Sequence, residues 1–123
     1  MRGDFQVSIQ RYGPTVHLTP MGELDWDTGP ALDDVSAALG DGVAVVVCGM
    51  RRLSFVDVTG VHRLLDLTHL IESRSIAFYA YNWQHQPQRL LDLIDGLEQC
   101  RGRGRGTHVA PTRPLRRVPR AIA

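Results

Sequence analysis

The chain has 123 residues, the length of one ordinary domain that can bury a core of its own. It contains no lysine, so chemistry that needs one, such as a P-loop or a Schiff base, is excluded. Its charge is divided along the chain, because residues 1–99 hold all 13 acids against seven arginines, whereas residues 100–123 hold seven arginines and no acid.

The first half of the chain predicts a hairpin, a helix and a buried strand. Apolar and polar residues alternate in "FQVSI", and a turn at "YGP" leads to the short strand "TVHLT", so an amino-terminal hairpin is expected. Asp27 or Thr28 then caps a helix that has Pro30 in its first turn and Gly40 as its stop. The run "VAVVVC" is apolar on both faces, which is typical of a strand buried on both sides.

The second half continues the alternation of helices and strands. Apolar residues at spacings of three and four predict a helix from about Thr59 to Glu72, and "IAFYAY" predicts the next strand. A third helix covers "QPQRLLDLIDG", with Pro87 in its first turn and Gly96 at its end. This order predicts a single α/β domain over residues 1–99, with a central mixed sheet, an N-terminal hairpin and helices packed as crossovers.

The regular pattern fails from residue 100 onward. Prolines interrupt every candidate element there, and the arginine-rich tail, residues 100–123, is predicted to be disordered. Its "RGRGRG" run is of a kind that follows a phosphate backbone, but the run is short and lacks interleaved aromatic residues. Nucleic-acid binding is therefore not favoured, and it would involve the tail alone.

The apolar runs of the chain are short. The longest, Val43 to Cys48, is far below the roughly 20 residues that a membrane-spanning helix needs. The start "MRGDFQVS" has an acid and polar residues where a signal peptide is apolar. We therefore expect a cytoplasmic protein that does not interact with a membrane.

The stretch "LSFVDVTGV", residues 53–61, places polar residues between an apolar run and a predicted helix. Asp57 and Thr59 stand at the helix start, where free backbone N–H groups attract side-chain oxygens or a phosphate. Helix capping alone, which contributes about 1 kcal/mol, would explain both residues. A binding site is the alternative, because open α/β sheets place such sites at the carboxyl ends of their strands.

Three segments in this order resemble the STAS domain family, in particular bacterial anti-sigma factor antagonists. They are "LTPMGELDWDTGPALDDVSAAL", "LSFVDVTGVHRLL" and "RLLDLIDGL", and together they span about residues 5–97. The corresponding family forms are a G-E-L-D segment with a downstream Thr, a D-S-[ST]-G segment at a helix start, and a late R-x-L-x-x-x-G-L. The resemblance implies a binding protein that controls sigma-factor-dependent transcription by binding an anti-sigma factor, which is also a serine kinase. Members usually finish with a further strand and helix, which the tail replaces here.

The resemblance also implies which residues bind the partner. The implied surface consists of Glu23, Asp25, Trp26, Asp57, Val58, Thr59, Gly60 and Arg63. Val58 stands where the family carries the serine that the kinase phosphorylates, and valine has no oxygen to accept a phosphate. Either Thr59 has become the phosphoacceptor, or the protein binds its partner without phosphorylation control. The second is favoured, because a hydroxyl at a helix cap is engaged with backbone N–H groups.

Other residue groups indicate alternatives that are weaker. His62, Asp66 and His69 share a helix face, but no further ligands complete a metal site, and a solvent-exposed face explains them. The carboxylates of the motifs lack an accompanying nucleophile or base, so we expect neither catalysis nor a cofactor. Trp26 and Trp83 are each either core residues or anchors for a partner. A different function, a ligand-sensing or scaffold subunit of the STAS type that binds a nucleotide or another phosphate, stays open.

Overall fold

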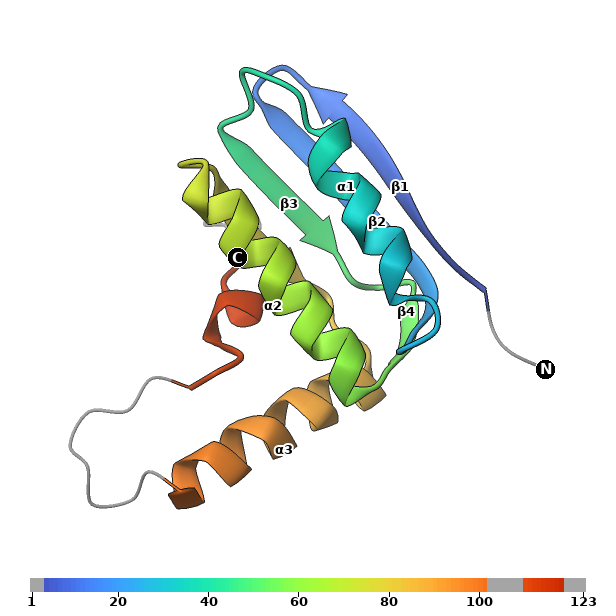
Figure 1. The fold of residues 1–123 in the computed structure, drawn as a ribbon, viewed down its shortest axis with the longest axis vertical. Helices are drawn as coiled ribbons and strands as arrows, with labels where there is room; N and C mark the ends of the chain where they lie inside the picture. The colour runs from blue at the N-terminus through green and yellow to red at the C-terminus, as the bar shows by residue number, and fades with distance from the viewer. Residues whose placement is uncertain (1–3, 102–109, 119–123) are drawn as a thin grey trace.

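The computed structural model describes residues 4–101 and 110–118, and these form one α/β domain (Figure 1). The strands are β1 (Phe5–Tyr12), β2 (Thr15–Leu24), β3 (Val45–Gly49), β4 (Leu53–Val56) and β5 (Ala77–Tyr81). The α-helices are α1 (Asp33–Ala38), α2 (Val58–Ser73) and α3 (His85–Arg101). Two 3-10 turns, η1 (Gly29–Leu32) and η2 (Arg113–Arg116), precede α1 and follow α3.

The strands form one mixed sheet in the order β1-β2-β3-β5, and β4 also pairs with β2. The hairpin β1–β2 is antiparallel, whereas β3 pairs in parallel with both β2 and β5. The predicted mixed sheet, N-terminal hairpin and crossover helices are thus confirmed. Strand β4 was not predicted, because it has only four residues and lacks a regular alternation of buried and exposed side chains.

Strand β2 is longer than predicted, because it changes its parallel partner halfway along. Thr15–Leu18 pairs with β3, and the end of the strand, from Gly22 to Leu24, pairs with β4. Pro20 lies between the two ladders, where a residue without an N–H group costs no ladder hydrogen bond. Gly22 has a φ of +101°, and a Cβ there would lie 1.8 Å from the carbonyl oxygen of Asp4, so only glycine fits.

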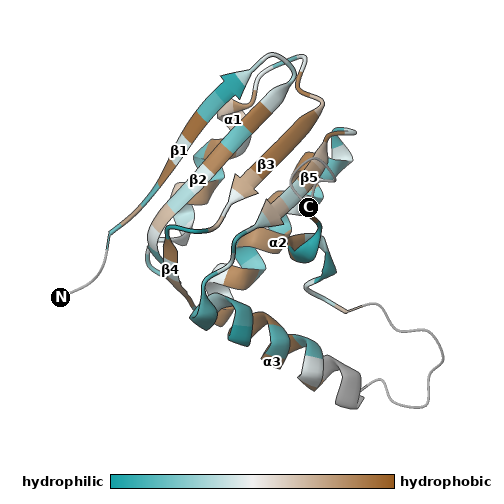
Figure 2. Ribbon diagram, turned by 180° about the vertical axis from the view of Figure 1, so that it is seen from behind, coloured by the Kyte–Doolittle hydropathy of each residue, from teal (hydrophilic) through white to brown (hydrophobic). Residues whose placement is uncertain are grey.

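The core lies between the sheet and the helices α1 and α2, which cover one face of the sheet (Figure 1). Figure 2 shows the opposite face of the sheet, with these helices behind it. Core residues from the strands include Val16, Leu18, Val46 and Phe78, and those from the helices include Val35, Leu64 and Ile71. Cys48 is part of this core, and burial raises the pKa of its thiol to about 12.

The helices differ from the prediction mainly at their ends. Gly40 follows α1 with a φ of +69°, as expected for a glycine that stops a helix. Gly96 was predicted to end α3, but the helix continues past it to Arg101. A glycine terminates a helix by adopting the left-handed conformation, and Gly96 is not among the glycines with a positive φ.

The prediction of disorder from residue 100 onward is wrong for residues 110–118. This segment, which includes η2, packs against β5 and α2 beside α3. Thr112 and Leu115 are fully buried, because the surrounding helices and the strand edge provide both an apolar pocket and polar partners. Most of the Arg-Gly repeat lies outside the described residues. Within the described parts of the chain, no helix has the length and apolar character needed to cross a membrane.

Candidate functional site

The G-E-L-D and D-V-T-G motifs of the sequence meet where β2 and β4 end. The two strands run parallel, and Leu24 pairs with Val56 at their carboxyl ends. The segments that follow, residues 25–28 and 57–60, therefore start side by side at one edge of the sheet. This is the position at which open α/β sheets usually carry their binding sites.

The carboxylate of Asp57 connects these two segments. One oxygen caps α2 by accepting a hydrogen bond from the backbone N–H of Gly60, with a distance of 2.7 Å. The other oxygen accepts from the backbone N–H of Trp26 at 3.2 Å. Capping was therefore a correct prediction for Asp57, but the carboxylate also fixes the loop after β2 against the start of α2.

The loop after β2 is held by its own side chains. The Asp25 carboxylate accepts from the backbone N–H groups of Asp27, at 2.9 Å, and Thr28, at 3.0 Å. The Thr28 hydroxyl accepts from the Asp25 N–H and donates to the carbonyl of Glu23, both at 2.9 Å. Thr28 was one of two predicted helix caps, yet its side chain makes no cap hydrogen bond to η1. These contacts give the loop one defined shape, with Trp26 at its tip.

The junction presents both apolar and polar groups to solvent. The Trp26 side chain is 63% exposed and Val58, the first residue of α2, is 50% exposed. Thr59 is also exposed, and its hydroxyl makes no hydrogen bond within the described part of the chain. The expectation that this hydroxyl is engaged at the cap is therefore wrong, because Asp57 performs the capping.

Gly60 and Arg63 fix the position of α2. Gly60 is buried against the end of β2. The Arg63 side chain packs on Gly29, and a Cβ built on Gly29 would lie 2.9 Å from the Nε of Arg63. The Arg63 guanidinium is 3.4 Å from a carboxylate oxygen of Asp33 at the start of α1. From Arg63 a shallow groove of about 320 Å³ continues between α1 and α2, with Leu67 and other residues of both helices in its walls.

Sequence reasoning missed Gln86, which supports the junction from α3. Its side chain accepts a hydrogen bond from the Val56 N–H at 3.0 Å and donates to the Val56 carbonyl at 2.9 Å. It thereby satisfies both backbone groups of the residue next to Asp57, as a neighbouring strand would. A glutamine in the first turn of an amphipathic helix carries no recognisable signal in the sequence.

We expect Gln86→Ala to lower the free energy of unfolding by about 1–3 kcal/mol, because it leaves two part-buried backbone groups unsatisfied. Urea unfolding followed by circular dichroism measures the change. Gln88→Ala is the matched control, since its side chain hydrogen-bonds to the exposed carboxylate of Asp92 and to no backbone group within the described residues. Equal stabilities of the two variants would contradict the role given to Gln86.

The structure brings together most of the predicted site residues. Glu23, Asp25, Trp26, Asp57, Val58, Thr59 and Gly60 all lie at the β2/β4 junction, and Arg63 follows one helical turn later. Partner binding by these residues stays a prediction. His62, Asp66 and His69 are exposed on α2, and the described residues contain no cluster of three potential metal ligands.

Comparisons with known proteins identify the fold. No protein-family model and no curated protein matches the chain. An anti-sigma factor antagonist from Mycobacterium paratuberculosis superposes with a TM-score of 0.64 at 18% identity, over 79% of this chain and 82% of that chain. The chain has the STAS fold. The unphosphorylated anti-sigma factor antagonist SpoIIAA gives a TM-score of 0.54 at 20% identity, over 80% of this chain and 99% of that chain.

The same fold occurs as part of longer chains. A crystal structure of Mglu gives a TM-score of 0.58 at 18% identity, over 64% of this chain. This chain spans only 20% of the length of Mglu. The STAS fold therefore occurs in proteins of different organisation, and the function of this chain has to be argued from its own residues.

Proposed function

We propose that this STAS protein is an anti-sigma factor antagonist, which binds an anti-sigma factor of the serine-kinase type and so controls sigma-factor-dependent transcription. The observation that supports it is the β2/β4 junction, where the Asp57 carboxylate holds the motif "DVTG" against the loop that carries Trp26. In this proposal the protein acts in the cytoplasm by binding its partner, and it has no catalytic activity.

The junction has the composition of a protein interface. The large side chain of Trp26 is exposed on a loop that is held by its own hydrogen bonds, and an exposed tryptophan is typical of an interface hot spot. Val58 adds exposed apolar area at the start of α2, directly after the Asp57 carboxylate, and Asp25 adds a second carboxylate in the loop that carries Trp26. A partner with an apolar pocket bordered by basic residues would complement this surface.

The proposal departs from the familiar pattern in its regulation. Val58 offers no phosphoacceptor, so the partner kinase is not expected to release this protein by modifying position 58. Thr59 is the remaining candidate, and its exposed hydroxyl at the second position of α2 is accessible. We still favour binding without phosphorylation control, because Thr59 is one residue, about 100° of helical rotation, away from the position of the familiar acceptor.

Titration against the anti-sigma factors of the same cell tests the proposal. We expect Asp57→Arg to weaken the complex at least about tenfold, because it places a positive charge at a surface that fits a basic partner and removes the link to Trp26. Asp57→Asn keeps the helix cap without the charge, and should weaken the complex less. Asp41→Arg, with the same charge change in the exposed loop after α1, is the control and should bind normally.

The alternative is a ligand-sensing or scaffold subunit that holds a nucleotide or another phosphate at the start of α2. It is less favoured, because an oxygen of Asp57 already occupies the Gly60 N–H that a phosphate would need. Thermal unfolding with a nucleoside triphosphate separates the two. A higher melting temperature with the nucleotide, together with no binding of any anti-sigma factor, would overturn the proposed function.

A further inference from the structure

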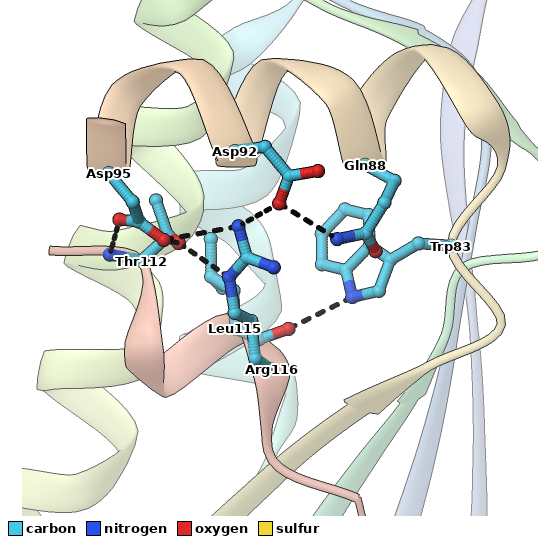
Figure 3. A network of polar contacts seen from close by, with 7 residues as sticks. All are labelled: Trp83, Gln88, Asp92, Asp95, Thr112, Leu115 and Arg116. Atoms are coloured by element: carbon cyan, nitrogen blue, oxygen red, sulfur yellow. Dashed lines mark hydrogen bonds and ion pairs between the residues drawn. The ribbon is translucent and has the colours of Figure 1, made fainter. Parts of the chain in front are cut away.

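Residues 110–118, here called the docked segment, pack against α2, the edge of β5 and side chains of α3 (Figure 3). The surface of these three elements that the segment covers is here called the notch. The segment follows α3 in the sequence, and residues 102–109 lie between the two. Leu115 is the apolar anchor, with 0% of its surface exposed, and it belongs to the same core cluster as Phe78 and Leu91. The notch therefore buries one leucine side chain completely.

Two acids of α3 bind the polar groups on either side of this anchor (Figure 3). The Asp95 carboxylate accepts from both the backbone N–H of Thr112, at 3.0 Å, and its hydroxyl, at 2.6 Å. The Arg116 guanidinium lies 2.8 Å from Asp92 and 3.1 Å from Asp95, and it also donates to the Thr112 hydroxyl. The hydrogen bond from Arg116 is the main reason why the pKa of Asp92 is lowered.

The main chain of the docked segment is recognised as well. Its carbonyl at Leu115 accepts from the indole N–H of Trp83 at 2.9 Å. Its carbonyl at Arg117 accepts from the backbone N–H of Ala80, so the segment pairs with the outer edge of β5 at one position. The Arg117 side chain forms an ion pair with Glu72 of α2.

These contacts have the pattern of a complex between a domain and a linear peptide. Such peptides combine main-chain hydrogen bonds along a sheet edge with side-chain pockets that select the sequence. Here the selected features are a threonine, a leucine three residues later and an arginine directly after it. The acidic residues of the notch, Glu72, Asp92 and Asp95, favour a peptide with basic charge.

We propose that the notch is a binding site for basic linear peptides of the pattern Thr-x-x-Leu-Arg, and that the docked segment occupies it in cis. A segment of a partner protein with this chemistry competes with the docked segment. The site is separate from the β2/β4 junction, so it does not depend on the proposed function. The covalent connection gives the docked segment an effective concentration on the order of mM, so a partner binds well only when the segment is weakened.

A labelled peptide with the sequence of the docked segment, "APTRPLRRV", tests this inference on the full chain. Two variants release the segment in different ways. Leu115→Glu introduces a charge into the apolar pocket, and Arg116→Glu opposes the carboxylates of Asp92 and Asp95. We expect both variants to bind the peptide at least about tenfold more tightly than the wild type, in which the docked segment competes.

Trp83 provides a second readout, because its indole contacts the docked segment. In a Trp26→Phe background it is the only tryptophan. The fluorescence emission of Trp83 should shift to longer wavelength in Leu115→Glu, because the segment no longer covers the indole. Addition of the peptide should restore the original wavelength. A control peptide with glutamate in place of the leucine should not restore it. Circular dichroism identifies which variants are folded. If Leu115→Glu does not fold, the peptide titration of Arg116→Glu decides the test. The inference is wrong if folded Arg116→Glu binds both peptides equally, or binds the first no better than the wild type.

Discussion

Replacing Gly60 with alanine is expected to lower the free energy of unfolding by about 1–3 kcal/mol, although alanine is the better helix former. A Cβ at this position would lie 2.6 Å from the carbonyl oxygen of Leu24 and 2.7 Å from a methyl group of Val56. The Leu24 carbonyl cannot retreat easily, because it accepts a hydrogen bond from the Asp57 N–H at 3.1 Å. The start of α2 would have to move away from both strands.

Gly96→Ala is the matched control for this prediction. Gly96 also lies inside a helix, but nothing is within 4 Å of a Cβ built there. Alanine should therefore raise the free energy of unfolding at that position, by about 0.5–1 kcal/mol. Urea unfolding of the two variants should give shifts of opposite sign. A Gly60→Ala variant as stable as Gly96→Ala would show that α2 does not approach the strands as closely as described.

The same displacement should reach the junction. The Asp57 carboxylate binds the Gly60 N–H with one oxygen and the Trp26 N–H with the other, so moving the first turn of α2 disturbs the loop that carries Trp26. Gly60→Ala should therefore weaken binding of the proposed partner more than its loss of stability explains, whereas Gly96→Ala should leave binding unchanged.

Local patterns predicted the parts of the fold that depend on local chemistry. The alternation around Val7, the turn before Thr15 and the helical spacing from Val61 to Ile71 each correspond to an observed element. The end of β2 was missed because Pro20 normally excludes a strand interior. It is tolerated here only because the parallel partner changes from β3 to β4 at that point, and this depends on tertiary structure.

The candidate site was predictable as a motif but not as a set of contacts. The spacing of Asp57 before an apolar helix indicated a cap, and its expected place at the carboxyl edge of the sheet indicated a site. The link from Asp57 to Trp26, and the support of Val56 by Gln86, join residues about 30 positions apart. The docked segment was missed for the same reason, since only the folded notch shows where Leu115 can be buried.

Under the proposed function, replacing Val58 with serine is expected to create a phosphorylation switch at this position. The side chain at this position is the first of α2 and half exposed, so a kinase bound at the junction can reach a hydroxyl there. Incubation with the partner kinase and ATP should add one phosphate to the tryptic peptide of residues 53–63, and mass spectrometry should locate it at position 58. Val58→Ala, which offers no acceptor there, and the wild type should stay unmodified.

The added phosphate should then end partner binding. It carries about −1.5 to −2 charges, and it would stand directly beside Asp57 at a surface that already presents Asp25. Burying these like charges against a partner costs several kcal/mol, so we expect the phosphorylated Val58→Ser variant to bind at least about 100-fold more weakly than its unmodified form. A phosphate on Thr59 of the wild type would contradict the proposal of binding without phosphorylation control. If phosphorylated Val58→Ser bound as tightly as the unmodified variant, the partner would not cover the start of α2, and the proposed interface would be wrong.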